Sequence, residues 1–233
     1  MSIITFLVEE AGLFVDHTDK IGRTPLHIAA SEGRAESVRE LLRLGADVTI
    51  RDIHCEGTLQ IAVRNNHIDS VKALLEDGNI SIEDYESNTG LNSLHLAAEA
   101  SNSGDTPLNN LVGRADCHID IVKILLENGA SVNERDGQWN QTPLHSASTN
   151  GNKEAVELLL EPGADVNSAT NTGDTPLHLS AVACHQDVTE ALINWGANVN
   201  AEDNDKSTPL NSAINSKCTG DLIQFLISNG DQL

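Results

Sequence analysis

The sequence contains few aromatic residues, and this shortage argues against a single thick core. Phenylalanine, tryptophan and tyrosine make up 3% of its 233 residues, whereas one globular core of this length usually buries more large rings. Leu, Val, Ile and Ala must therefore supply the apolar packing. We expect thin layers of these smaller side chains.

Basic residues are also scarce, since 14 Lys and Arg stand against 35 Asp and Glu and the formal net charge is −21. Because this charge repels phosphate backbones and anionic membranes, we expect binding to neither nucleic acid nor membrane. Two interpretations of the charge stay open. It keeps the protein in solution, or an acidic face holds a basic partner.

Cysteines are few and far apart, and long apolar runs are missing. The four cysteines are Cys55, Cys117, Cys184 and Cys218. Their spacing matches neither a paired zinc site nor a disulfide framework, so we expect a reducing compartment, the cytosol or the nucleus. The first 15 residues lack a basic region and contain Glu9-Glu10, which argues against a signal peptide. No apolar run is long enough to span a membrane.

The chain contains a four-residue motif that recurs. Thr-Pro-Leu-His begins at Thr24, Thr142 and Thr175, and weaker copies begin at Gly57, Asn92 and Thr208. The leucines of the six copies are spaced by 33, 35, 50, 33 and 33 residues. A period of about 33 residues is typical of a stacked repeat array.

Each position of the first block has a physical role. Thr24 is a candidate N-cap and Pro25 a first helical residue. Gly33 and Gly45 can adopt positive φ and end the two helices of the block. One apolar position of the second helix is leucine in all six blocks, at Leu41, Leu74, Leu125, Leu159, Leu192 and Leu226. Because one helix pair cannot bury such a stripe alone, we expect stacked pairs with a continuous core.

These blocks resemble ankyrin repeats. The resemblance is clearest in Gly22–Ala30, Gly33, Leu41-Leu42 and Gly45–Val48, and again in Gly173–Ala181, Leu192-Ile193 and Gly196–Asn200. It implies an all-α solenoid of six stacked helix-turn-helix units with short β-hairpin-like connections. It also implies that His27, His95, His145 and His178 form hydrogen bonds between adjacent repeats.

We divide the chain into a half repeat and six repeats. The half repeat or cap is 1–18, and the repeats are 19–51, 52–86, 87–136, 137–169, 170–202 and 203–233. Repeat three carries an insert at 100–116, which is a decayed duplicate, a short extra helix capped by Thr106, or both. We expect Leu108, Leu111 and Val112 to cover the array edge opposite the hairpin tips. Neither end of the array is strongly polar, so one side of each end helix is core, or the ends associate, or the chain was cut from a longer array.

No constellation of residues predicts catalysis. Carboxylates are plentiful, but they occur without a nucleophile, a phosphate loop or an orienting base. Cys117-His118 and Cys184-His185 lie two repeats apart, so a shared zinc would have to bridge the intervening repeat. We therefore expect no enzyme, no cofactor and no metal; a metal-binding protein or enzyme is the alternative of a different class.

The resemblance implies binding of a protein or peptide through the hairpin tips and the exposed side of the first helices. The candidate residues are Ile21, Arg23, Ile53, His54, Glu56, Tyr85, Asn88, Leu91, Gln138, Trp139, Gln141, Asn171, Thr172, Asp174, Asn204 and Asp205. We single out Trp139, because no stacking rule requires a large ring there and exposed tryptophans often dominate interface energies. The alternative is that Trp139 folds back onto the neighbouring hairpin. We expect Trp195 to pack.

Several specific roles fit such a surface. They are an inhibitor of a Rel-type transcription factor, a ubiquitin-ligase substrate receptor, or a fragment of a larger scaffold or venom-type repeat protein. Asn133, Asn167 and Asn200 resemble the sites that asparagine hydroxylases modify in ankyrin-like proteins.

Overall fold

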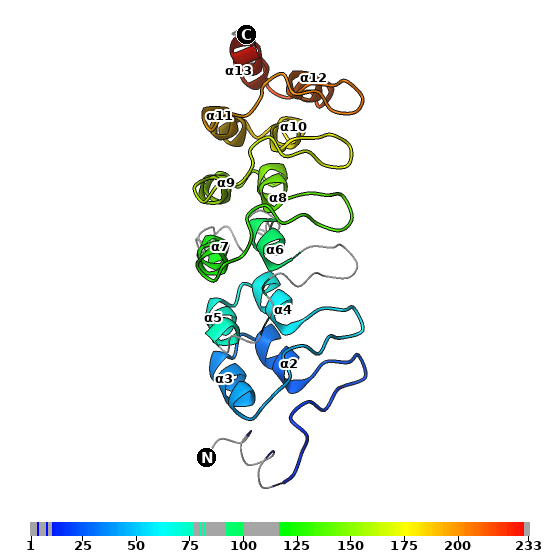
Figure 1. Cartoon of the computed structure of the whole chain (residues 1–233), viewed down its shortest axis with the longest axis vertical. Helices are drawn as coiled ribbons and strands as arrows, with labels where there is room; N and C mark the ends of the chain where they lie inside the picture. The colour runs from blue at the N-terminus through cyan, green and yellow to red at the C-terminus, as the bar shows by residue number, and fades with distance from the viewer. Residues whose placement is uncertain are drawn as a thin grey trace.

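The computed structural model describes residues 4, 8, 11–76, 80, 82, 92–99 and 117–230, in which helix pairs stack along one axis (Figure 1). The first helices of the pairs are α2 (Pro25–Ser31), α4 (Thr58–Arg64), α6 (Ser93–Glu99), α8 (Pro143–Thr149), α10 (Pro176–Val182) and α12 (Pro209–Asn215). The second helices are α3 (Ala35–Arg43), α5 (Ile68–Glu76), α7 (Cys117–Glu127), α9 (Lys153–Leu160), α11 (Gln186–Asn194) and α13 (Gly220–Gly230). Figure 1 shows the two sets as parallel columns, with the connecting loops on the side of the first helices.

The recurring motif starts each first helix as expected. The Thr24 hydroxyl accepts a hydrogen bond from the His27 backbone N–H at 3.4 Å, and the Thr24 N–H donates to His27 Nδ1 at 3.2 Å. These reciprocal bonds form a capping box in which histidine takes the place of the usual Glu or Gln. Pro25 then occupies the first turn, where its missing N–H costs nothing. The same box recurs at Thr142 and Thr175.

Residues with positive φ end the helices. Gly33 has φ +68° and Gly45 has φ +83°, which confirms the role predicted for both glycines. The position of Gly33 is held in other repeats by residues that carry a Cβ and still adopt positive φ, namely Asn66, Cys184 and Lys217. The helix boundary is therefore set by the stacking of the repeats as well as by glycine.

The core is the continuous layer that the leucine pattern predicts. The second-helix leucines are all buried, from Leu41 at 3% exposure to Leu226 at 1%. One apolar cluster extends from the first repeat to Ala197. A smaller cluster at the junction of the fifth and sixth repeats consists of Ala181, Ala213, Leu222 and Leu226.

The connections between repeats are hairpin-like loops, and in the described loops a polar side chain fixes the tip by accepting backbone hydrogen bonds. Asp136 Oδ1 accepts from the N–H groups of Trp139 at 2.8 Å and Gln141 at 3.0 Å. The equivalent acceptors in the other described loops are Asp19, Asp52, Thr170 and Asp203. Part of the acidic excess therefore holds the loops in shape.

The expectation of no disulfide is wrong, because Cys184 and Cys218 are bonded, with their Cα atoms 5.3 Å apart. Stacking places these positions of consecutive repeats side by side, although 34 residues separate them. Among the described residues, no helix combines the length and apolar character needed to cross a membrane. The expected insert at 100–116, with Thr106, Leu108, Leu111 and Val112, lies outside the described residues.

Candidate protein-binding surface

Three of the four recurring histidines, His95, His145 and His178, join adjacent repeats as the resemblance implied. The exception among the described residues is His27, whose buried Nε2 has no hydrogen-bond partner. His95 Nε2 lies 3.0 Å from the carbonyl of Gln141, and His178 Nε2 lies 3.1 Å from that of Ser207. His145 Nε2 donates to the Asp174 carbonyl at 3.2 Å while its Nδ1 accepts from the Thr142 N–H at 3.0 Å. Each of these three rings thus connects the start of one first helix to the hairpin of the next repeat.

The four recurring histidines are fully buried. Burial lowers the pKa of His27 and His95 and lowers that of His145 to about 4. The hydrogen bond from His145 to the Asp174 carbonyl acts in the opposite direction. His145 is therefore neutral near pH 7 and has the geometry of a structural group.

The zinc hypothesis finds no support in the described part of the chain. No three His, Cys, Asp or Glu side chains converge there in a way that could hold a metal ion. The sulfur of Cys184 is committed to Cys218. The side chains of Cys117 and His118 lie outside what the structure describes.

The hairpin tips form a row along one side of the array (Figure 1), which we call the tip row. Its largest exposed apolar side chains are Ile53, at 62% exposure, and Trp139, at 53%. Backbone hydrogen bonds link neighbouring tips: Ile53 N donates to Ile21 O at 3.0 Å, and Asn171 N donates to Trp139 O at 3.0 Å. The tip row is therefore a set of loops held against each other.

Trp139 has a fixed backbone and an exposed ring. Its N–H donates to Asp136, its carbonyl accepts from Asn171, and the Asn171 amide also donates to Gln138 O at 3.3 Å. The ring keeps half of its surface in solvent. This placement leaves a large apolar group available without a loop having to be ordered first.

The remaining candidate residues divide by their own contacts. Arg23 forms an ion pair with Asp19 at 3.0 Å, and Glu56 pairs with Arg64 at 3.0 Å. The exposed polar candidates of the tip row are His54, Gln138, Asn171, Thr172, Asn204 and Asp205, whereas Ile21, Gln141 and Asp174 are half-buried. Tyr85, Asn88 and Leu91 lie outside the described residues.

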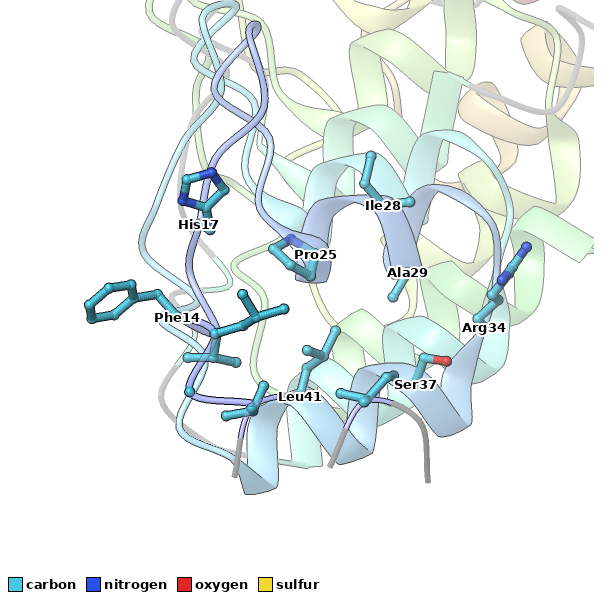
Figure 2. A pocket seen from close by; sticks show the side chains of 13 residues that line it. Phe14, His17, Pro25, Ile28, Ala29, Arg34, Ser37 and Leu41 are labelled. Carbon is cyan, nitrogen blue, oxygen red and sulfur yellow. The ribbon is translucent and has the colours of Figure 1, made fainter. Parts of the chain in front are cut away.

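Two exposed apolar features were missed by sequence reasoning. Trp195 is 46% exposed at the C-terminus of α11, so the expectation that it packs is wrong. The second feature is a hollow of about 740 Å³ at the N-terminal end, lined by Leu13, Phe14, α2 and α3 (Figure 2). Phe14 is 83% exposed beside it. The apolar residues 13–15 are the sequence feature that could indicate this hollow. Their pattern also fits the extended segment between two repeats, so the sequence alone does not distinguish the two.

The three candidate hydroxylation sites hold adjacent repeats together. Asn133 Oδ1 accepts from Asp165 N at 2.8 Å, and its Nδ2 donates to Gly163 O at 3.2 Å. Asn167 and Asn200 form the corresponding bonds to the carbonyls of Gly196 and Gly230. All three side chains are also exposed.

A stack of helix pairs with a fixed row of exposed loops defines a class of protein, the helical repeat solenoids that present a surface to partners. Within this class the chain belongs to the ankyrin-repeat family. Models described as an ankyrin repeat, as many copies of ankyrin repeats and as three copies match residues 21–53, 94–160 and 164–233, respectively. Ankyrin repeats are protein-interaction modules, and this fold is generally non-enzymatic.

Several named proteins are about 30% identical to the chain over the segments that align. The human transient receptor potential cation channel subfamily A member 1 is 30% identical over 67% of the chain and 12% of its own length. The NF-kappa-B inhibitor cactus of Drosophila melanogaster is 30% identical over 66% of the chain and 27% of its length. The mouse B-cell lymphoma 3 protein homolog is 30% identical over 68% of the chain and 32% of its length.

One solved structure matches nearly the whole chain. The ankyrin repeat domain of Bcl-3, described as a unique member of the IkappaB protein family, superposes with a TM-score of 0.76 at 26% identity. The match covers 96% of this chain and 90% of that domain. By contrast, the chain spans a third or less of the named relatives given above.

Proposed function

We propose that this array binds a protein or peptide segment along the tip row, with Trp139 and Ile53 as the main apolar contacts. The observation that carries the proposal is an exposed tryptophan on a loop whose backbone is fixed on both sides by Asp136 and Asn171. Large aromatic side chains with polar surroundings supply much of the binding energy of protein interfaces. A fixed loop also lowers the ordering entropy of binding.

The net charge of −21 favours a basic segment as the partner. An acidic surface raises the association rate of a basic ligand and makes the rate depend on salt. Several acids of the tip row are used internally, as in the Arg23–Asp19 and Arg64–Glu56 pairs. The attraction therefore comes from the field of the whole array more than from one ion pair.

The test uses peptides selected from a random displayed library against the purified chain. We expect Trp139→Ala to weaken the binding free energy of the selected peptides by about 2 kcal/mol or more, without lowering the melting temperature of the protein. Trp195→Ala is the matched control, because it removes a tryptophan of similar exposure from the end of a second helix. Titration calorimetry at low and high salt gives the readout. Equal affinity for the wild type and Trp139→Ala would contradict the proposal.

A second candidate function is the inhibition of a Rel-type transcription factor. The likeness to the NF-kappa-B inhibitor cactus and to the Bcl-3 domain favours it, and it would place the protein in the cytoplasm or the nucleus. We expect a purified Rel-type DNA-binding region to bind the wild type more tightly than Trp139→Ala. Absence of binding at micromolar concentrations would remove this candidate and leave the peptide-binding proposal intact.

We also propose Asn133, Asn167 and Asn200 as substrates of an asparagine hydroxylase. Their exposed side chains support access, although their amides must release the next repeat's backbone before they react. Intact mass after co-expression with such an enzyme should rise by one oxygen per modified site. An unchanged mass would count against the proposal.

A further inference from the structure

We infer that the Cys184–Cys218 disulfide is a redox-sensitive clasp that fixes the sixth repeat to the fifth. Cys184 lies in the turn after α10, and Cys218 lies in the turn after α12. Their Cα separation of 5.3 Å falls in the range that a disulfide requires. The inference does not depend on which partner binds the tip row.

Two other junctions of the array show what usually occupies these positions. Between the first two repeats, His67 Nε2 lies 3.0 Å from the carbonyl of Ser31 and its ring covers Gly33. A Cβ added to Gly33 would lie 2.6 Å from that ring. Gly151 and His185 repeat the arrangement between the fourth and fifth repeats, with the same clearance of 2.6 Å. At these two junctions the histidine ring occupies the space that a Cβ would need, and glycine leaves that space free.

At the last junction both members of the pair have changed. Cys184 carries a Cβ at φ +60°, where a histidine ring from residue 218 would collide with it. The shorter Cys218 avoids this collision and reaches the other sulfur. Cys218 Sγ also lies 3.1 Å from the Ala181 carbonyl, so the reduced thiol is placed to donate there. The two cysteines therefore replace Gly and His as a pair.

The sixth repeat is the part of the array that needs such a bond. In the described structure it contacts one neighbour, and its buried apolar residues Ala213, Leu222 and Leu226 form a small cluster with Ala181 of the fifth repeat. The half-buried Ile193 is the side chain that packs against both this cluster and the main core. Because the stability of a repeat array is a sum of repeat and junction terms, a terminal repeat with one junction opens most easily. A covalent bond across that junction restricts the opened state.

The exposure of the two residues gives an order to the chemistry. Cys184 is exposed and Cys218 is half-buried, so the Cys184 thiolate attacks a small disulfide such as oxidised glutathione and releases one small thiol. The Cys218 thiolate then attacks the Cys184 sulfur of the mixed disulfide and releases the second. Two protein thiols become one disulfide while one small disulfide becomes two thiols. A dithiol reverses both steps.

The test compares hydrogen exchange of the whole chain after treatment with oxidised glutathione and after treatment with dithiothreitol. We expect reduction to speed exchange in α12 and α13 by up to about 500-fold, from the loop entropy of cysteines one repeat apart. Exchange in α2 to α9 should stay unchanged. Peptide mapping should find Cys184 linked to Cys218 in the oxidised sample and not in the reduced one.

Two double variants separate redox control from packing. Cys184→Ser with Cys218→Ser should exchange rapidly in both buffers. Cys184→Gly with Cys218→His rebuilds the pair of the other junctions and should exchange slowly in both. Equal exchange of the oxidised and reduced wild type would overturn the clasp, as would mapping that finds no Cys184–Cys218 link after oxidation.

Discussion

At the scale of single residues, the buried histidines show how one side chain serves two repeats. His145 Nδ1 accepts from the Thr142 N–H, so a proton on Nδ1 would face another N–H. Its Nε2 remains free to donate to the Asp174 carbonyl of the next hairpin. The neutral ring satisfies both bonds, and protonation would break the first.

This geometry predicts a pH dependence of stability. Burial lowers the pKa of His145 from 6.5 to about 4, so between these values the unfolded chain binds a proton that the folded chain does not. The free energy of unfolding should therefore fall as the pH drops from about 6.5 to about 4, by at most about 3 kcal/mol from this residue. Urea unfolding at several pH values measures the slope.

The control for this prediction is His145→Gln, because Gln60 already occupies the same position in the second repeat. Gln60 Oε1 accepts from the Gly57 N–H at 3.0 Å, as a histidine Nδ1 would. The variant should keep its stability at pH 7.5 and lose part of the slope below pH 6.5. A slope equal to that of the wild type would show that His145 does not contribute.

At the scale of elements, one side-chain acceptor fixes the tip of each described hairpin. Asp136 is only 5% exposed, and its Oδ1 binds two N–H groups of the tip that carries Trp139. The loop thus gains a fixed shape without strand pairing along its length. The carboxylate of Asp136 therefore serves this loop as a hydrogen-bond acceptor.

Removing that acceptor should loosen the tip. Asp136→Ala leaves two N–H groups without their partner, and we expect the free energy of unfolding to fall by about 1 to 3 kcal/mol. Asp136→Asn retains an oxygen acceptor and should lose much less. Chemical denaturation of the two variants beside the wild type decides this. An equal loss in both would mean that the charge, not the acceptor, matters.

At the scale of the whole molecule, stability varies along the array because each repeat contacts only its neighbours. Leu125 lies in the continuous core, whereas Leu226 belongs to the smaller cluster at the junction of the fifth and sixth repeats. Both leucines are buried to 1% exposure or less. The two sites have the same side chain and similar burial but different positions, so comparing them isolates the effect of position in the array on stability.

Leu125→Ala and Leu226→Ala should each lower the stability of their own repeat by about 2 to 5 kcal/mol. The consequences for the rest of the array should differ. The interior change should lower the main unfolding transition, because it weakens two junctions. The terminal change should open only residues 203–230, as an early transition before the rest unfolds. Hydrogen exchange followed by mass spectrometry locates the opened segment. Opening of the whole chain at once in Leu226→Ala would argue for a single cooperative unit.

The sequence predicts the layers of this fold well, because caps, helix ends and the leucine column are local or periodic signals. Thr24, Gly33 and Leu41 each act as their positions in the repeat require. The Cys184–Cys218 bond does not follow from cysteine spacing alone, because its separation matches the repeat period and not a compact cysteine motif. A separation of 34 residues is one repeat period plus one residue. Only the stacking geometry shows that such a separation brings two side chains together.

The candidate surface was predicted less completely. Periodicity indicates which residues sit at hairpin tips, and the structure places Ile53 and Trp139 there with exposed side chains. Periodicity does not predict what fraction of an aromatic side chain the neighbouring repeat buries. The exposure of Trp195 and the hollow beside Phe14 depend on such coverage, and packing alone decides it.

The hydrogen bonds between neighbouring loops, such as Ile53 N to Ile21 O, give the row a regular pitch. Packed helices lie about 8 to 10 Å apart, and an extended peptide advances about 3.3 Å per residue. A peptide lying along the row would thus meet a new loop at about every third residue. Ile53 and Trp139 belong to loops two repeats apart, so a ligand that reached both would carry its two apolar side chains about six residues apart.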